Sequence, residues 1–360
     1  WWLLASLPAI FLAEIAWTVG STVVLKWLVL GRLRPGAYPL WGCQYLRWWF
    51  VDRVLEGAHN TVGFLAETPL LTTYYRLLGA RIDRRKFAGQ PTRLDHPKML
   101  APDLVELGPG VNCSAHVTIS CASVYGGMLH VSEVKIEEGC ELSPGSYVSP
   151  GSHLPPSTQL LPMATSSGHL GSLPGMTVPC NQFRGEESRR REEEESAECF
   201  WRQQHLLRLL VGLPFLGWIF ITPNLVTILL LECIWGLCQA LLAPEVAWPV
   251  YWFLLTPPVI TFGYSGCLLV NVILQKRLVV GRLGPGLVIG PPGSCSFDDA
   301  AWKQAHWNSF RRWLHERSVT SHVFEHTLDA LVNSELLSCV HRQLGAKVGR
   351  RVQSDNFKVV

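Results

Sequence analysis

The feature that most constrains this chain is a six-residue periodicity between positions 136 and 160. An aliphatic residue recurs at every sixth position, and a small residue lies four positions after each of the first four. The aliphatic residues are Ile136, Leu142, Val148, Leu154 and Leu160, and the small residues are Cys140, Ser146, Ser152 and Thr158. An earlier fragment, with Leu107, Cys113 and Ile119, fits the same grid.

This period matches one side of a three-sided, left-handed parallel β-helix. The aliphatic residue points inward, the small residue fits near the corner, and the glycines at 139, 145 and 151 adopt the turn conformation. Stacked coils bury an apolar column that no single coil buries alone. We therefore predict a left-handed β-helix over 105–160, with the five aliphatic residues stacked inward. Residues 120–133 break the grid, which predicts an excursion where functional residues are commonly carried.

Long apolar runs indicate an integral membrane protein. Hydrophobic residues make up 48 % of the 360-residue chain and charged ones 16 %, against about 25 % charged in soluble domains. Residues 246–275 and 209–231 carry no charge, and 1–30 are nearly free of it. About 20 apolar residues span a bilayer core, so each run is long enough to cross. The shorter run 233–244 is expected to extend a neighbouring helix.

An internal repeat organises the chain. Residues 26–36 match 276–286 at a shift of 276 − 26 = 250, and residues 76–85 match 342–351 at a shift of 342 − 76 = 266. Two matched blocks in the same order predict a duplicated architecture. Each copy has membrane helices, a Gly-Arg-Leu turn, Trp- and Arg-rich helices suited to the headgroup layer, and a basic connector.

The predicted fold class is mixed: transmembrane α-helices plus a left-handed parallel β-helix, tandemly duplicated, with the second copy truncated. Basic clusters after the membrane helices of each copy predict a β-helix on the cytoplasmic side. A net charge of +3 gives no footprint for nucleic acid. A charged linker is predicted at 165–200, and its alternative is a helix that continues out of the membrane. The expected domains are membrane helix 1–34, interfacial helices and connector 35–100, β-helix 101–164, charged linker 165–200, membrane helices 201–280, and second-copy interfacial helices with the start of a truncated β-helix 281–360.

Two aromatic-rich motifs, together with the ladder, carry a family resemblance. Tyr38 to Arg53 reads YPLWGCQYLRWWFVDR, and Glu67 to Ile82 reads ETPLLTTYYRLLGARI. The chain resembles the terminal domain of non-ribosomal peptide synthetases of the poly-lysine synthetase type, a membrane-bound relative of hexapeptide acyltransferases. The resemblance implies transfer of acyl or aminoacyl groups from a phosphopantetheine thioester, held by a carrier protein or coenzyme A, with no cofactor bound directly. It also implies further copies of the unit, in cis or as an oligomer.

One departure leaves catalysis open. The family's excursion holds a His followed by acidic residues, whereas this chain has Cys121 or Ala122 followed by Ser-Val-Tyr-Gly-Gly. A catalytically degenerate structural domain is therefore the alternative to an active transferase. A transporter is a third possibility, disfavoured because charges within the apolar runs are so few.

The candidate catalytic residues are His130 and His116, because acyl transfer needs a base for the acceptor's proton. They are the imidazoles nearest the excursion, and we expect His130→Ala, or failing that His116→Ala, to lower transfer by at least about 100-fold. Cys121 is an alternative nucleophile. His322 and His326 share a helical face but lack the HExxH order, so no metal site is predicted.

Overall fold

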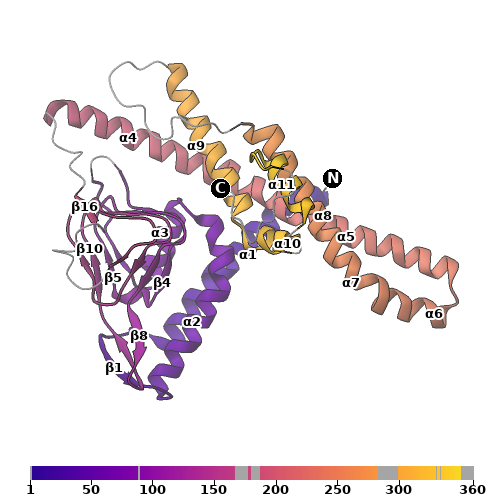
Figure 1. The fold of residues 1–360 in the computed structure, drawn as a ribbon, viewed down its shortest axis with the longest axis horizontal. Helices are drawn as coiled ribbons and strands as arrows, with labels where there is room; N and C mark the ends of the chain where they lie inside the picture. Colours follow the sequence, from indigo (N-terminus) through magenta and orange to yellow (C-terminus); the bar gives the residue numbers. More distant parts are fainter. Residues whose placement is uncertain are drawn as a thin grey trace. The chain divides into compact units, whose positions relative to one another are not determined.

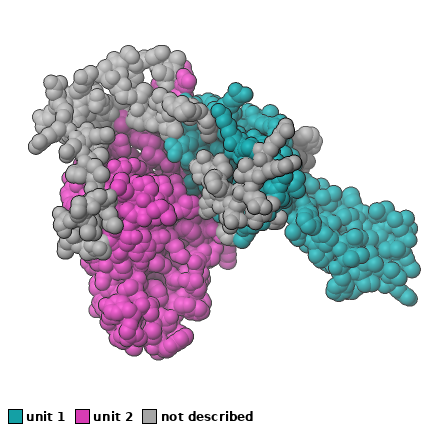
Figure 2. All heavy atoms as spheres, in the orientation of Figure 1, with its two compact units in different colours: residues 1–14, 209–289, 307–360 teal, residues 15–208, 290–306 magenta. Residues whose placement is uncertain are grey.

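The computed structural model divides the chain into two compact units, shown separately coloured in Figure 2. Unit 1 comprises residues 1–14, 209–289 and 307–360, and unit 2 comprises 15–208 and 290–306. The structure describes residues 2–87, 90–166, 177–179, 187–282, 299–329, 331–332 and 334–349.

Three helical stretches in the described part of the chain are long and apolar enough to cross a membrane. They are Ser6–Leu30, Ala197–Leu241 and Glu245–Val280. The uncharged runs 209–231 and 246–275 lie within the second and third stretches, and 233–241 extends the second, as expected. The helices of the first two stretches are α1 (Trp2–Leu25), the π-helix η1 (Lys26–Leu30), α4 (Glu187–Leu207), the π-helix η4 (Arg208–Gly212) and α5 (Leu213–Leu241).

The third stretch contains two consecutive prolines, Pro257 and Pro258. The two prolines lie in the short α7 (Thr256–Pro258), between the π-helices η5 (Val250–Leu255) and η6 (Val259–Gly263). Proline has no N–H to donate to the preceding turn, and widened turns accommodate the interruption. The remaining segments are α6 (Pro244–Pro249), α8 (Tyr264–Gln275) and the π-helix η7 (Lys276–Val280).

The central part of unit 2 is a region of parallel strands, which we call the three-sheet domain (residues 81–166). Successive strands enter three sheets in rotation, with orders β13-β10-β5-β2, β14-β11-β6-β3 and β15-β12-β7-β4 (Figure 1). A further strand, β16 (Thr177–Pro179), pairs antiparallel with β14. The strands are β2 (Arg81–Ile82), β3 (Arg93–Leu94), β4 (Lys98–Leu100), β5 (Val105–Leu107), β6 (Asn112–Cys113), β7 (Thr118–Ser120), β10 (Val134–Ile136), β11 (Glu141–Leu142), β12 (Tyr147–Val148), β13 (His153–Leu154), β14 (Thr158–Leu160) and β15 (Thr165–Ser166).

The burial predicted from the six-residue period is confirmed. All five aliphatic residues of the ladder are at most 1 % exposed. In register, Ile136 lies opposite Leu107 and Leu154, and Leu142 lies opposite Cys113 and Leu160. The ladder glycines at 139, 145 and 151 have φ between 65° and 77°, the left-handed region that glycine adopts without strain.

The predicted excursion is also present. Residues 122–131 form a hairpin of β8 (Ala122–Tyr125) and β9 (Met128–Val131), outside the three parallel sheets. Strand β1 (Gly36–Pro39) pairs antiparallel with β9 on its other side. The turn that follows the first apolar span therefore contributes a strand to the excursion.

The two copies of the repeat have matching backbone geometry. In the first, the π-helix η1 ends at Gly31 (φ 64°), whose N–H donates to the carbonyl of Lys26. In the second, η7 ends at Gly281 (φ 65°), whose N–H donates to the carbonyl of Lys276. The first shift of 250 positions thus relates two turns of the same conformation.

The second matched block is equally similar. Helix α3 (Pro69–Leu77) corresponds to α11 (Glu335–Leu344) at the shift of 266. Arg76 donates to the carbonyls of the sixth and seventh residues after it, and Arg342 does the same. The internal repeat is therefore a structural one. Between its two blocks, the second copy has helices α9 (Asp299–Val319) and α10 (His322–Asp329), where the first has α2 (Cys43–Val62) and the 3-10 turn η2 (Gly63–Leu65).

Two expectations differ from the structure or lie outside it. The charged run from Glu187 forms helix α4, which continues into the second apolar stretch. This arrangement corresponds to the alternative, a helix continuing out of the membrane, and not to a linker. Residues 167–176 and 180–186 of the predicted linker lie outside the described residues. The start of a second β-helix was expected within 281–360. Residues 283–298 and 350–360 of that range also lie outside the described residues.

Leu142→Ala should lower the free energy of unfolding of unit 2 by about 2–5 kcal/mol, because it empties a fully buried site between strands β6 and β14. Thermal unfolding followed by circular dichroism in detergent measures this. The matched control is Glu141→Ala, the neighbouring half-exposed residue, which should change stability little. Equal effects of the two substitutions would contradict the inward orientation of Leu142.

Candidate functional site

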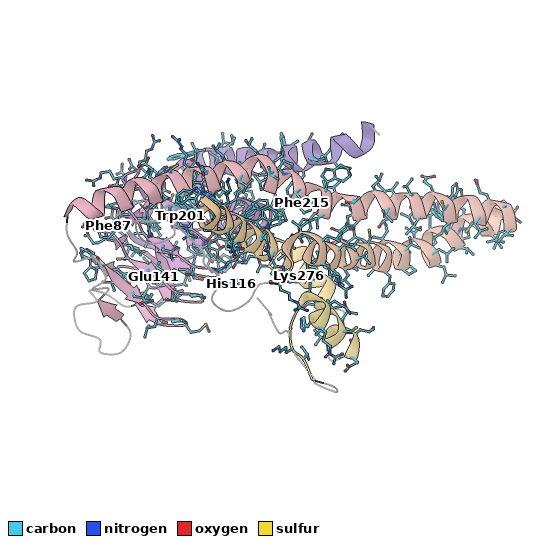
Figure 3. All side chains as sticks on the ribbon, turned by 90° about the horizontal axis from the view of Figure 1, so that it is seen from above. Phe87, His116, Glu141, Trp201, Phe215 and Lys276 are labelled. Carbon is cyan, nitrogen blue, oxygen red and sulfur yellow. The ribbon has the colours of Figure 1, made fainter. Side chains whose placement is uncertain are left out.

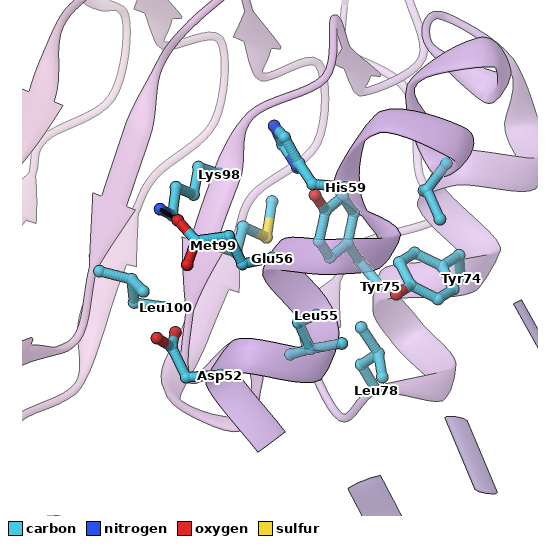
Figure 4. Close-up of a pocket in the computed structure, with 11 residues that line it drawn as sticks. Asp52, Leu55, Glu56, His59, Tyr74, Tyr75, Leu78, Lys98, Met99 and Leu100 are labelled. Carbon is cyan, nitrogen blue, oxygen red and sulfur yellow. Dashed lines mark hydrogen bonds and ion pairs between the residues drawn. The ribbon is translucent and has the colours of Figure 1, made fainter. Parts of the chain in front are cut away.

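A small cavity in unit 2 lies where α2, α3 and β4 meet (Figure 4). Its volume of about 30 Å³ has room for one or two water molecules or a small polar group. Helix α2 lines it with Asp52, Leu55, Glu56, His59 and Val62, and β4 with Lys98, Met99 and Leu100. The remaining lining residues are Tyr74 and Tyr75 of α3 and Leu78, which directly follows α3. A carboxylate pair, an ammonium and an imidazole therefore surround an otherwise apolar space.

His59 is held in place by a second imidazole. Its ring stacks on that of His96, with centroids 3.6 Å apart and planes inclined by 20°. The Nε2 of His96 lies 2.6 Å from the carbonyl oxygen of His59, and because a carbonyl only accepts, Nε2 of His96 is the donor. A Cβ on Gly63 would lie 2.9 Å from the His96 ring, so the helix end leaves room for this stack.

His59 is a neutral imidazole at neutral pH. Burial lowers the pKa of His59 from 6.5 to about 4, and the positive charges of Lys98 and His116 act in the same direction. An uncharged imidazole has a lone pair available to accept a proton. The environment therefore keeps His59 in the form that a general base requires.

Glu56 is ionised at neutral pH, and Asp52 lies one helical turn before it on the same face of α2. Glu56 accepts a hydrogen bond from Lys98 Nζ at 2.9 Å, and this contact holds the pKa of Glu56 below its usual value. Arg53 pairs with both Asp52 and Glu56 from outside the cavity. The site thus offers carboxylates for a cationic acceptor and one ammonium group for a developing negative charge.

His116, one of the two predicted catalytic residues, lies near this site. It is exposed and labelled in Figure 3, and its charge acts on the pKa of His59. It has φ 58°, at the ladder position that glycine occupies at 110, 139, 145 and 151. A non-glycine residue in this conformation is strained, and such strain is concentrated at functional sites.

His130, the other predicted catalytic residue, lies on the hairpin. Its ring stacks on Tyr125 at a centroid distance of 3.7 Å, and β9 pairs on both sides with β1 and β8. Neither His130 nor His116 lines the cavity. The structure associates His116 with His59 and gives His130 a separate aromatic partner.

The other candidates are placed less favourably. Cys121 is fully buried, and burial raises the pKa of its thiol to about 12, so it is not an available nucleophile. His322 and His326 lie in α10, as their spacing predicts. Among the described residues, no group of three or more His, Cys, Asp or Glu side chains is placed to hold a metal ion.

His59 and His96 were missed by the sequence reasoning, which looked for a base on the excursion. One signal was present: Asp52, Glu56 and His59 recur at spacings of four and three, which places them on one helical face. Lys98 of β4 lies at the cavity opposite this face because of tertiary packing, which no local pattern predicts.

Part of this chain is similar in sequence to a known protein. The chain is 31 % identical over 127 residues to Delta-poly-L-ornithine synthetase of Acinetobacter baumannii (strain AB307-0294). The match covers 35 % of this chain and 9 % of that protein, so this chain spans only a small part of its relative's length. No family model matches the chain, and no solved structure matches it. The chain is therefore similar, over about a third of its length, to a synthetase of an amino acid polymer.

The pH dependence of stability should report on His59. Because its folded pKa of about 4 lies below the unfolded value of 6.5, the unfolded state binds more protons between these values. Through His59 alone, stability should thus be full above pH 6.5 and fall by on the order of 3 kcal/mol as pH drops to 4. His59→Gln should remove this share of the slope in thermal unfolding measured across the range, and the slope that stays comes from His205 and His315, whose pKa burial also lowers to about 4.

The matched control for this measurement is His326→Gln, at an exposed imidazole of unit 1. It should leave the slope between pH 6.5 and 4 as it is in the parent protein. A His59→Gln variant with an unchanged slope would show that His59 is not the buried neutral imidazole.

Proposed function

We propose that this chain is a membrane-bound acyl- or aminoacyl-transfer module of a synthetase that makes an amino acid polymer. The similarity to Delta-poly-L-ornithine synthetase carries the proposal. The donor is a phosphopantetheine thioester, held by a carrier protein or coenzyme A, and the acceptor is an amine. Three helices suited to a bilayer support a module that works at the membrane.

The three-sheet domain is proposed to be a left-handed parallel β-helix. After the excursion the strands return to the same sheet after 18 residues, as from Ile136 to Leu154 and from Leu142 to Leu160. Three six-residue sides make one such turn, which supports the assignment. The interior is filled by aliphatic side chains, so a substrate binds outside the coil, against α2 and α3.

The proposed chemistry uses His59 as the base. The acceptor nitrogen attacks the thioester carbonyl, forming a C–N bond, and the C–S bond then breaks to release a thiolate. After the attack the nitrogen carries a positive charge and is far more acidic than a free ammonium, so a weak base with a pKa of about 4 suffices to accept its proton. Lys98 stabilises the negative charge that develops on the carbonyl oxygen.

His116 is proposed to move the proton onward. It is exposed, acts electrostatically on His59 and is held at φ 58°, so it connects the buried imidazole to the solvent and the departing thiolate. Asp52 and Glu56 orient the cationic acceptor. His130 stays a second candidate for contact with the donor, because the hairpin that carries it lies outside the coil.

A structural role is the second candidate function, and the size of the cavity favours it. A volume of about 30 Å³ is well below the roughly 300 Å³ or more of ordinary ligand pockets. In that case the domain serves assembly with further copies of the unit, and the transfer chemistry belongs to another part of the synthetase.

Activity separates the two functions. The full-length protein in detergent is incubated with an aminoacyl-pantetheine thioester and ornithine, and the amide product is measured by mass spectrometry. His59→Ala should lower transfer by at least about 100-fold. His116→Gly should also lower transfer while leaving stability unchanged or slightly higher, because glycine adopts φ 58° without strain.

The matched control is Ser157→Gly, which replaces another residue with positive φ (53°) at the same ladder position. It should match His116→Gly in stability and retain full transfer. If His59→Ala and the double substitution of His116 and His130 all retain normal turnover, the structural function is correct.

We also propose that the β-helix lies on the cytoplasmic side, together with the turn after the third span. Tyr147 and Arg282 are replaced singly by cysteine in a protein where the exposed cysteines of the described residues, Cys43, Cys233 and Cys339, are changed to serine together with Cys180 and Cys295. A membrane-impermeant maleimide should label both positions from the cytoplasmic face of inside-out vesicles. Labelling of the two positions from opposite faces would overturn this topology.

A further inference from the structure

Helix α2 carries an exposed apolar face. Trp49 and Phe50 follow Leu46 by three and four positions, which places all three on one side of the helix, and they are between 43 % and 48 % exposed. Trp41, just before the helix, is 78 % exposed, and its ring packs edge-on against Tyr45 at a centroid distance of 5.9 Å. We call Trp41, Leu46, Trp49 and Phe50 the aromatic face. Large apolar side chains gathered on one exposed surface mark an interaction site.

The aromatic face and the cavity lie on different sides of the same helix. Asp52, Glu56 and His59 line the cavity, on the side of α2 that faces β4 (Figure 4). At about 3.6 residues per turn, this side lies about a third of a turn from the aromatic face. Helix α2 therefore packs on the three-sheet domain with one side (Figure 1) and presents the aromatic face outward with another.

The helix lies beside the end of the first apolar stretch. The π-helix η1 forms that end, and α2 contacts it. Trp27 of η1 is also exposed, and its Nε1 donates a hydrogen bond to the carbonyl of Leu77 in α3. Trp is enriched where a span leaves the bilayer, with its ring at the level of the headgroups. The aromatic face thus belongs to a helix held at the level where the headgroup layer is expected.

The charges around the aromatic face are all positive. Between Trp27 and Val51 the charged residues are Arg32, Arg34 and Arg47, and this segment contains no Asp or Glu. All three arginines are exposed. A basic residue close to an anionic membrane surface contributes about 1 kcal/mol of attraction. The same charges disfavour a symmetric contact with a second copy of this chain, because like charges would meet.

We propose that the aromatic face docks on an anionic lipid surface. The apolar side chains enter the boundary between headgroups and acyl chains, and Arg32, Arg34 and Arg47 bind lipid phosphates. Because α2 also forms one wall of the cavity, the bilayer supports the helix that carries Asp52 and Glu56. This inference does not depend on the proposed transfer activity.

Fluorescence quenching tests the proposal in the full-length protein. Phe50→Cys is made in the background used for maleimide labelling, coupled to nitrobenzoxadiazole and placed in nanodiscs of phosphatidylcholine and phosphatidylglycerol. Lipids with a nitroxide near the top of the acyl chain should quench the fluorophore at least about twofold, because an interfacial helix sinks its apolar face about 5–10 Å into the headgroup boundary. Aqueous iodide should quench it little.

The matched control is Lys135→Cys, at an exposed position of β10, in a different sheet of the same domain from β4. There iodide should quench strongly and the nitroxide lipid little. Leu46→Cys reports on the same face as Phe50→Cys and should give the same pattern, so the test stands if either variant fails to fold.

Two outcomes would overturn the proposal. If iodide quenches the label at position 50 as strongly as the label at position 135, the aromatic face is in water. If neither iodide nor the nitroxide lipid reaches position 50, protein covers the face, and a second copy or another partner is its occupant.

Discussion

The ion pair between Lys26 and Asp103 is the contact on which the geometry of unit 2 depends most. It joins the end of the first apolar span to the 3-10 turn η3 (Pro102–Leu104), which follows β4 directly. Since β4 supplies three residues to the cavity, the pair also fixes one wall of the candidate site. Removing one partner of a buried pair costs about 3–5 kcal/mol, because the other charge is left without compensation. The membrane helix and the candidate site are therefore coupled energetically.

The ladder illustrates what a sequence period predicts well. Burial of Ile136, Leu142 and Val148 follows from spacing alone, because each six-residue unit adds one strand to the next sheet and one phase of the period faces inward. The break in this period predicted an excursion at 120–133, which the structure forms as the hairpin 122–131. The internal repeat was likewise visible as matched glycines and arginines, since these residues determine the backbone of the turns.

The candidate site was less accessible to such reasoning. His59, His96 and Lys98 come from different elements, and their association depends on which face of α2 packs against β4. The acidic residues on that face were a usable signal, but a pattern on one helix does not specify its partner. Cys121 shows the converse, because its position next to the excursion suggested reactivity, whereas the fold buries it completely. Burial decides the protonation state of His59 and of Cys121, and burial is a property of the assembled structure.

The rotation of strands through three sheets limits how the domain can change in length. An insertion of six residues would keep every aliphatic side chain facing inward but would move each later strand to the next sheet. Unless the added residues leave the sheets, as the hairpin at 122–131 does, a change of 18 residues, the separation of Leu142 and Leu160, is needed to restore both orientation and sheet. Length therefore varies in whole turns, added most easily beyond β15, at the opposite end of its sheet from β4. A chain lengthened beyond β15 in this way would keep the same cavity and gain new outer surface.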